Sequence, residues 1–237
     1  MTVTIDMRSI LPPVRDQGTR GTCLAFAVTA LHEALRARRA QGKDDLAEEA
    51  LYWGCKKIDG DWTTGTSFES ASAALPRWGQ PFGSQWPYDP RLLDGAPYDP
   101  PTTPGGADWF RAGLRPVDKT SASVRTLLAG NFPVALGITL YPSFYRPSST
   151  GYVADPQLGD PMKGRHAVVA VGFDGANILI RNSWGLLWGL SGYGWISDSY
   201  VDSHTNDMWT IDVNPPTVVT NTDGTTLQSE ENTYGTS

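Results

Sequence analysis

Residues 17–26 read Gln-Gly-Thr-Arg-Gly-Thr-Cys-Leu-Ala-Phe. Apolar residues then recur at spacings of three and four, which predicts a helix that packs one face on a core. They are Leu24, Ala27, Val28, Leu31 and Leu35. Because Gly21 and Thr22 come directly before this pattern, we expect the helix to begin at Cys23.

A cysteine in the first turn of a helix is well placed for chemistry. A thiol is a weak nucleophile until it loses its proton, and the unpaired N–H groups and the dipole at a helix N-terminus favour the thiolate. Considered alone, Cys23 would more often be a small buried residue. The second cysteine, Cys55, falls late in another expected helix, and we interpret it as a buried free thiol.

Two downstream blocks carry further polar candidates. Residues 164–173 place His166 at the start of an apolar run that predicts a buried strand, and residues 180–185 read Ile-Arg-Asn-Ser-Trp-Gly. Taken singly, His166 would be a core histidine whose hydrogen bonds are satisfied, and the second block would be a turn that ends a strand. Their occurrence in order behind Gln17 and Cys23 favours a catalytic site instead.

Together the three blocks resemble the active-site segments of the papain and cathepsin family of cysteine peptidases. In that family a Gln, a Gly-rich turn and the nucleophilic Cys open a helix, and the His and Asn follow far downstream. The separation of Cys23 and His166 lies within the roughly 130 to 150 residues typical of the family. The resemblance covers residues from about 5 to 213.

The resemblance implies a role for each residue. Cys23 would attack the substrate carbonyl as a thiolate paired with the imidazolium of His166. Asn182 would hold that imidazole in its working tautomer, and Trp184 would cover their hydrogen bond from water. The Gln17 amide and the Cys23 N–H would form the oxyanion hole. This chemistry needs no metal and no organic cofactor.

The family's substrates lie in a groove between two lobes, which implies candidate substrate-binding residues here. We assign Gly65, Thr66, Arg165 and Trp184 to that role. Residues 64–67 stand where the family commonly has paired glycines that contact the substrate backbone, so recognition at this wall should differ.

Two other positions depart from the family pattern. Arg20 stands where secreted members usually carry a disulfide cysteine, and Leu24 replaces the aromatic residue that usually follows the nucleophile. We therefore expect packing, rather than a disulfide, to stabilise this region.

The expected fold class is α+β, with a papain-like helical lobe over about 15–105 and an antiparallel β-barrel-like lobe over about 106–213. The active-site cleft should lie between them. Further helices are predicted at about 44–56, after Ser67 and at 121–129, and residues 79–106 should form an irregular crossing. The predicted strands are 133–140, 166–174, 177–182, 192–199 and 207–213. Residues 214–237 are polar, and we expect a flexible tail.

Composition excludes several other functions. The chain has 237 residues, 40% of them hydrophobic, and a formal net charge of -6 without any basic stripe, so we expect no nucleic-acid partner. No apolar run is long enough for membrane insertion, and no signal peptide is evident. With only two cysteines, the chain fits a reducing, cytoplasmic compartment, or delivery by a route without a cleavable signal.

Other functions stay open at this point. An acyl transferase or deamidase would share the same thioester intermediate, and a non-catalytic peptide-binding module would keep the groove without turnover. The expected partner is a protein or peptide substrate. Because residues 6–8 resemble the start of a mature catalytic domain, with no inhibitory prosegment before them, restraint by an inhibitory or regulatory protein partner or by narrow specificity is a further hypothesis. The alternative is that the chain is part of a longer protein.

Overall fold

The structure is a computed structural model that describes residues 4–92, 95–213, 218–220 and 226–228. Its helices are α1 (Cys23–Arg38), α2 (Glu48–Asp59), α3 (Phe68–Arg77), α4 (Ser121–Ala129) and α5 (Asp198–His204), with short 3-10 turns η1 (Arg8–Ile10) and η2 (Pro142–Tyr145). Its strands are β1 (Ile5–Asp6), β2 (Gly113–Pro116), β3 (Val134–Leu140), β4 (Gly164–Phe173), β5 (Asn177–Arg181), β6 (Tyr193–Ser197), β7 (Thr205–Asp212), β8 (Val218–Thr220) and β9 (Thr226–Gln228).

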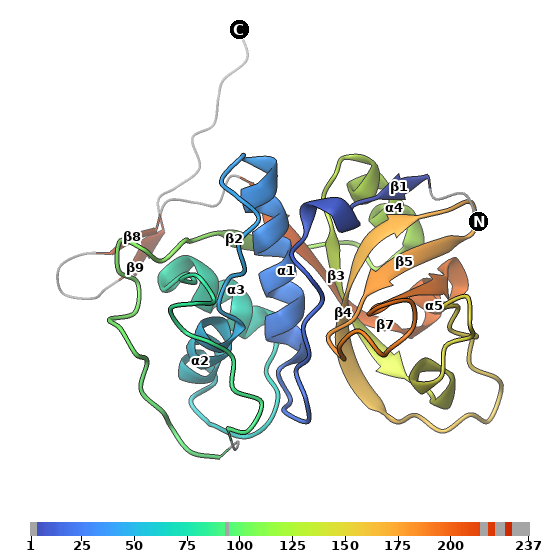
Figure 1. Cartoon of the computed structure of the whole chain (residues 1–237), viewed down its shortest axis with the longest axis horizontal. Helices are drawn as coiled ribbons and strands as arrows, with labels where there is room; N and C mark the ends of the chain where they lie inside the picture. Colours follow the sequence, from blue (N-terminus) through green and yellow to red (C-terminus); the bar gives the residue numbers. More distant parts are fainter. Residues whose placement is uncertain (1–3, 93–94, 214–217, 221–225, 229–237) are drawn as a thin grey trace, which may run out of the picture.

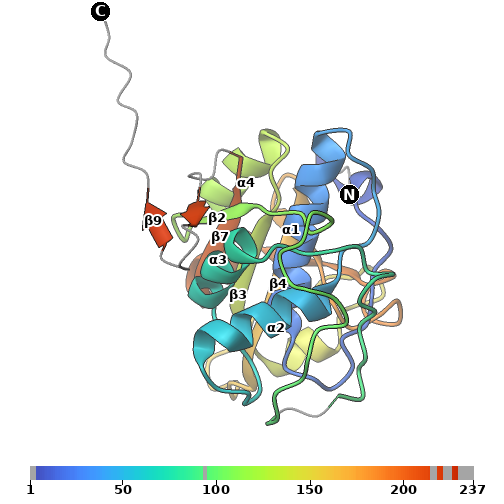
Figure 2. The same cartoon turned by 90° about the vertical axis from the view of Figure 1, so that its left-hand side faces the viewer.

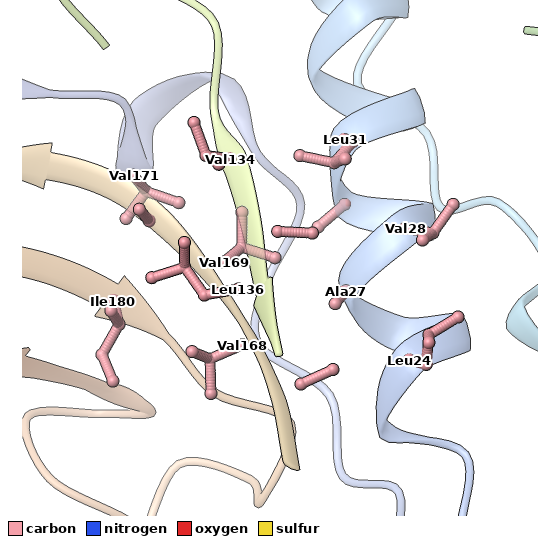
Figure 3. Packing of buried hydrophobic residues seen from close by; sticks show 14 of the residues in the cluster. Leu24, Ala27, Val28, Leu31, Val134, Leu136, Val168, Val169, Val171 and Ile180 are labelled. Carbon is pink, nitrogen blue, oxygen red and sulfur yellow. The ribbon is translucent and has the colours of Figure 1, made fainter. Parts of the chain in front are cut away.

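Helix α1 begins at Cys23, as predicted, and lies at the centre of the molecule (Figure 1). On one side it packs against β3 and β4, where Val169 of β4 points toward α1 (Figure 3). On the other side it contacts α2 and α3. Every residue from Leu24 to Arg36 is therefore buried. The expectation of a single buried face was wrong, because α1 has packed layers on both sides.

The large sheet has the strand order β2-β7-β3-β4-β5-β6, and β1 pairs with β4. All of these pairings are antiparallel. In β3 and β4 the register sets Ile138 opposite His166 and Gly137 opposite Ala167. The sheet thus carries the candidate histidine to the edge of α1.

Helices α2 and α3 form the helical part on the other side of α1 (Figures 1 and 2). Ser67 caps α3 by accepting a hydrogen bond from the Ser70 N–H, and Gly60 ends α2 in the left-handed conformation with φ of 74°. Helix α2 begins later than expected, since Leu46 pairs with Phe82 of the irregular crossing just before it.

Sequence analysis missed several short elements. Strands β1 and β2 are too short to show a periodic pattern. The strand expected over 192–199 ends at Ser197, because that hydroxyl accepts a hydrogen bond from the Tyr200 N–H and so caps α5. Most of the predicted tail lies outside the described residues, and its described part, β8 and β9, pairs as a small antiparallel sheet.

No helix within the described ranges is long and apolar enough to cross a membrane.

Candidate active site

Cys23 is the first residue of α1 and is partly exposed. Burial raises the pKa of its thiol, while hydrogen bonds from the backbone N–H groups of Ala167, Leu24 and Cys23 itself act in the opposite direction. The contact with Ala167 matters most for the site, because Ala167 is the neighbour of His166 in β4. It brings the sulfur to the strand that carries the histidine.

His166 lies near the start of β4 and is buried. Its Nε2 lies 2.7 Å from the Oδ1 of Asn182, directly after β5. That Oδ1 also accepts the Ser183 N–H at 2.8 Å, which identifies it as the amide oxygen. Nε2 must therefore carry the proton, and Nδ1 is left as the ring nitrogen that can accept one.

Burial acts against the ion pair expected from sequence. Burial lowers the pKa of His166 to about 4, and the Asn182 hydrogen bond offsets only part of this. With the thiol pKa of Cys23 raised as well, burial disfavours either charge alone. The two charges can persist together, because each offsets the burial cost of the other.

Aromatic rings enclose the histidine. The centroid of the Trp184 ring lies 4.7 Å from that of His166, and the Phe144 centroid lies 6.0 Å from the His166 centroid. Trp188 stacks on Phe144, and Tyr145 stacks on Trp184. These rings pack around His166, and the role expected for Trp184, covering the His166–Asn182 hydrogen bond from water, stays a prediction.

Gln17 is buried, and both ends of its side-chain amide are held. The Nε2 donates to the Arg20 carbonyl oxygen at 2.7 Å, and the Oε1 accepts the Ser183 hydroxyl at 2.6 Å. The Gln17 backbone N–H donates to the Ser183 carbonyl at 2.8 Å. Gln17 is thus bonded directly to the residue that follows Asn182, and within the described ranges no acceptor takes the second N–H of its amide.

One cavity of about 320 Å³ connects the nucleophile with the histidine. Cys23 and His166 both line it, together with three of the predicted substrate-binding residues, Gly65, Thr66 and Arg165. Trp184, the fourth, is not among its lining residues and packs on His166 instead. Gln17 and Asn182 also lie outside the lining.

The far wall of the cavity was not predicted. It is formed by Phe68, Gly137 and Asp207, from α3, β3 and β7. A Cβ at Gly137 would lie only 3.3 Å from the Phe68 ring and 3.4 Å from the Asp207 Cβ. The glycine therefore keeps this wall open. No short motif marks these residues, because they meet only through the pairing of strands.

The remaining cysteine and histidines have structural places. Cys55 is a buried free thiol, as predicted, and burial raises its pKa to about 12. His32 is buried, and its Nδ1 lies 3.0 Å from the Gln80 Oε1. His204 packs edge-on against Tyr141 and Tyr200.

Comparison with known proteins adds to this geometry. The sequence model described as papain family cysteine protease matches residues 1–211. The chain belongs to the papain family of cysteine proteases.

Individual relatives agree with the family assignment. Cysteine proteinase 3 of Entamoeba histolytica is 30% identical over 80% of this chain, and papain of Carica papaya is 26% identical over 78%. A peptidase C1-like protein of Acanthamoeba polyphaga mimivirus is 24% identical over 88%. The chain spans 72% of the length of the mimivirus protein but only 61% and 51% of the other two.

Solved structures of cysteine proteases share the fold. Xylellain, a cysteine protease from Xylella fastidiosa, superposes with a TM-score of 0.76 at 25% identity and covers 90% of this chain and 88% of its own. A Carica candamarcensis cysteine protease, solved in complex with E-64, gives 0.72 at 22% identity, covering 91% and 100%. The predictions of a papain-like family, an α+β fold and a cysteine-protease class are thereby confirmed.

Proposed function

We propose that this papain-family chain hydrolyses peptide bonds in protein or peptide substrates through a Cys23 acyl-thioester. The observation that carries the proposal is the cavity that Cys23 and His166 line together. Because Asn182 engages the Nε2 of His166, the Nδ1 nitrogen is the one available to the thiol proton.

The first half of the reaction cleaves the peptide bond. The Cys23 thiol gives its proton to His166 as the sulfur attacks the scissile carbonyl carbon. The resulting oxyanion accepts hydrogen bonds from the free Gln17 N–H and the Cys23 backbone N–H. His166 then protonates the leaving amine, the carbon–nitrogen bond breaks, and an acyl-thioester is left.

The second half restores the enzyme. His166 takes a proton from a water molecule, whose oxygen attacks the thioester carbonyl. The carbon–sulfur bond breaks, the acid product leaves, and the proton returns to the thiolate. Thr66 and Gly65 line the cavity where a substrate side chain would enter, and an inhibitory protein partner would compete for the same groove.

A peptide library read by mass spectrometry tests this proposal. We expect cleavage products that gain one water across a backbone bond, and we expect Cys23→Ala to abolish them while the fold stays intact, because the thiol contributes chemistry and little packing. Products joined to an added amine, or loss of ammonia from a side-chain amide, would instead favour the transferase or deamidase alternative. No product from the parent protein would favour the non-catalytic module.

An activated thiolate should also react selectively. We expect an epoxide or vinyl sulfone warhead to label Cys23 far faster than Cys55, which is buried with its pKa raised to about 12. Equal labelling of the two cysteines in a peptide mass map would contradict the mechanism.

We also propose a reducing compartment for the chain, since Cys23 and Cys55 are both free thiols. Fractionation of the source cells, with recovery of the chain in an oxidising compartment, would contradict this.

A further inference from the structure

Arg20 is a buried cation in the loop between Gln17 and Cys23, and only 5% of it is exposed. Its guanidinium binds Glu49 of α2 with both terminal nitrogens, at 2.6 Å and 2.9 Å. The same group donates to the Asp89 carbonyl at 2.9 Å. A bidentate pair of this kind fixes direction as well as distance, so Arg20 ties the loop to both α2 and the irregular crossing.

The partner carboxylate is held equally firmly. Glu49 is fully buried and accepts the Tyr98 hydroxyl at 2.5 Å. The Arg20 guanidinium also lies over two rings, 5.0 Å from the centroid of Tyr88 and 5.4 Å from that of Tyr52. The pair is therefore a closed cluster, shielded from water.

Tyr88 connects this cluster to both ends of the loop. Its hydroxyl donates to the Gln17 carbonyl at 2.8 Å and lies 2.7 Å from the Thr22 hydroxyl. Thr22 immediately precedes Cys23. The segment that carries both oxyanion donors is thus held at its beginning and at its end.

Arg20 also acts on the Gln17 amide through its own backbone. Its carbonyl accepts one N–H of the Gln17 Nε2 at 2.7 Å. The amide is planar, so fixing one N–H fixes the direction of the other. That second N–H is the one the proposed mechanism assigns to the oxyanion.

We propose that Arg20 and Glu49 are a positioning pair for the oxyanion hole. By anchoring the Arg20 backbone, whose carbonyl holds the Gln17 amide, the ion pair aims the free Gln17 N–H at the position where negative charge develops. The inference rests on the proposed function. The pair would thus stabilise the transition state as well as the fold.

The physical reason lies in the loop itself. Residues 17–22 belong to no helix or strand, so no regular ladder holds their carbonyl and N–H groups. A buried ion pair is directional, and leaving either charge unpaired is strongly unfavourable, so the loop has one preferred position. Hydrophobic contact alone would permit the small shifts that reduce transition-state stabilisation.

A double-mutant cycle tests the proposal. We expect Glu49→Gln to lower kcat by about tenfold, with KM changed by less than about threefold, because oxyanion contacts strengthen only in the transition state. In a Gln17→Ala background the same substitution should lower kcat by less than about twofold, since the donor that the pair aims is already gone.

Two companion variants separate positioning from stability. Tyr88→Phe removes only the hydroxyl that bridges Gln17 and Thr22, and it should reproduce part of the kcat loss even if Glu49→Gln folds poorly. Asp198→Asn breaks the partly buried ion pair between Arg125 of α4 and Asp198 of α5, in which the guanidinium lies 2.9 Å from the carboxylate. Neither residue lines the cavity. The substitution should lower the urea midpoint and leave kcat unchanged.

The outcomes are distinct. Parental kcat in folded Glu49→Gln and in Tyr88→Phe overturns the positioning role. An equal loss of kcat with and without Gln17 also overturns it, because the pair would then act by another route. If the parent protein itself cleaves no peptide, the proposed function fails first, and the positioning role fails with it.

Discussion

The two halves of the site are held in place by different interactions. On the nucleophile side, the loop before Cys23 is fixed by buried ions: Arg20 binds Glu49, and Arg15 binds Glu33 at 2.6 Å. On the histidine side, His166 is held by the neutral Asn182 amide and by aromatic rings. The same small volume therefore contains one region organised by ion pairs and one organised by a neutral amide and aromatic rings.

Each arrangement suits its segment. The nucleophile loop lacks regular structure and needs directional contacts to define its position. His166 already has a position, because it pairs with Ile138 of β3, and what it needs is an environment that shields its hydrogen bond to Asn182 from water. In this site, the position of the nucleophile loop and the surroundings of the histidine are therefore set by separate groups of residues.

The largest effect should come from breaking the histidine side. We expect Asn182→Ala to lower kcat by about 100-fold to 1000-fold, because the imidazole loses the acceptor that selects its tautomer. Steady-state kinetics on a cleaved peptide measures this.

Gln80→Ala is the matched control. It removes the amide partner of the other buried histidine, His32, and should lower stability without a comparable loss of kcat. Similar kinetics for the two variants would show that a buried histidine–amide pair contributes only structure.

A pH-dependent effect on stability should come from the nucleophile side. Burial raises the pKa of Glu48 to about 7, and its 2.6 Å contact with Arg15 lacks hydrogen-bond geometry. The unfolded chain releases this proton near pH 4.5 and the folded protein near pH 7, so the folded state binds more protons between them. The free energy of unfolding should therefore fall as pH rises through this window.

Glu48→Gln should remove that contribution, about 2 kcal/mol between pH 5 and pH 7. Urea unfolding of parent and variant at both pH values measures it as a difference. The difference is needed because His32 and His166 contribute to the pH dependence with the opposite sign. Their pKa values are lowered to about 4 in the folded protein, so their contribution to the free energy of unfolding falls as pH drops below about 6.5. Identical pH slopes for the two proteins would rule the contribution out.

The smallest expected effect concerns the cavity where the two halves meet. Asp207 lines it, and no cation pairs with its carboxylate among the described residues. Together with the apolar Phe68 wall, this favours a substrate side chain with an aliphatic stem and a basic end. We expect Asp207→Asn to reduce kcat/KM for a lysine or arginine peptide about fivefold relative to a norleucine peptide.

Glu69→Gln is the control for this specificity. Glu69 also lines the cavity but is exposed, so solvent screens its charge and its effect should be smaller. An equal effect of both substitutions would mean that general negative potential, rather than the Asp207 position, selects the substrate.

Much of the fold could be predicted where the sequence is periodic. The start of α1 at Cys23 and the bounds of α4 at Ser121 and Ala129 were predicted as observed. The predictions failed where a residue's state depends on distant partners, as at Leu46, whose pairing with Phe82 delays α2. Short strands such as β1 were missed because two residues carry no periodic pattern.

By itself, the sequence determined the family, the chemical type of each candidate site residue and the order in which they occur, because local motifs encode these. Only the tertiary structure decided that Arg20 meets Glu49, that Gly137 keeps a wall open beside Asp207, and that Trp184 covers His166 instead of lining the cavity. These contacts join residues far apart in the chain. Their energies depend on burial and geometry, which exist only once the helices and the sheet have packed together.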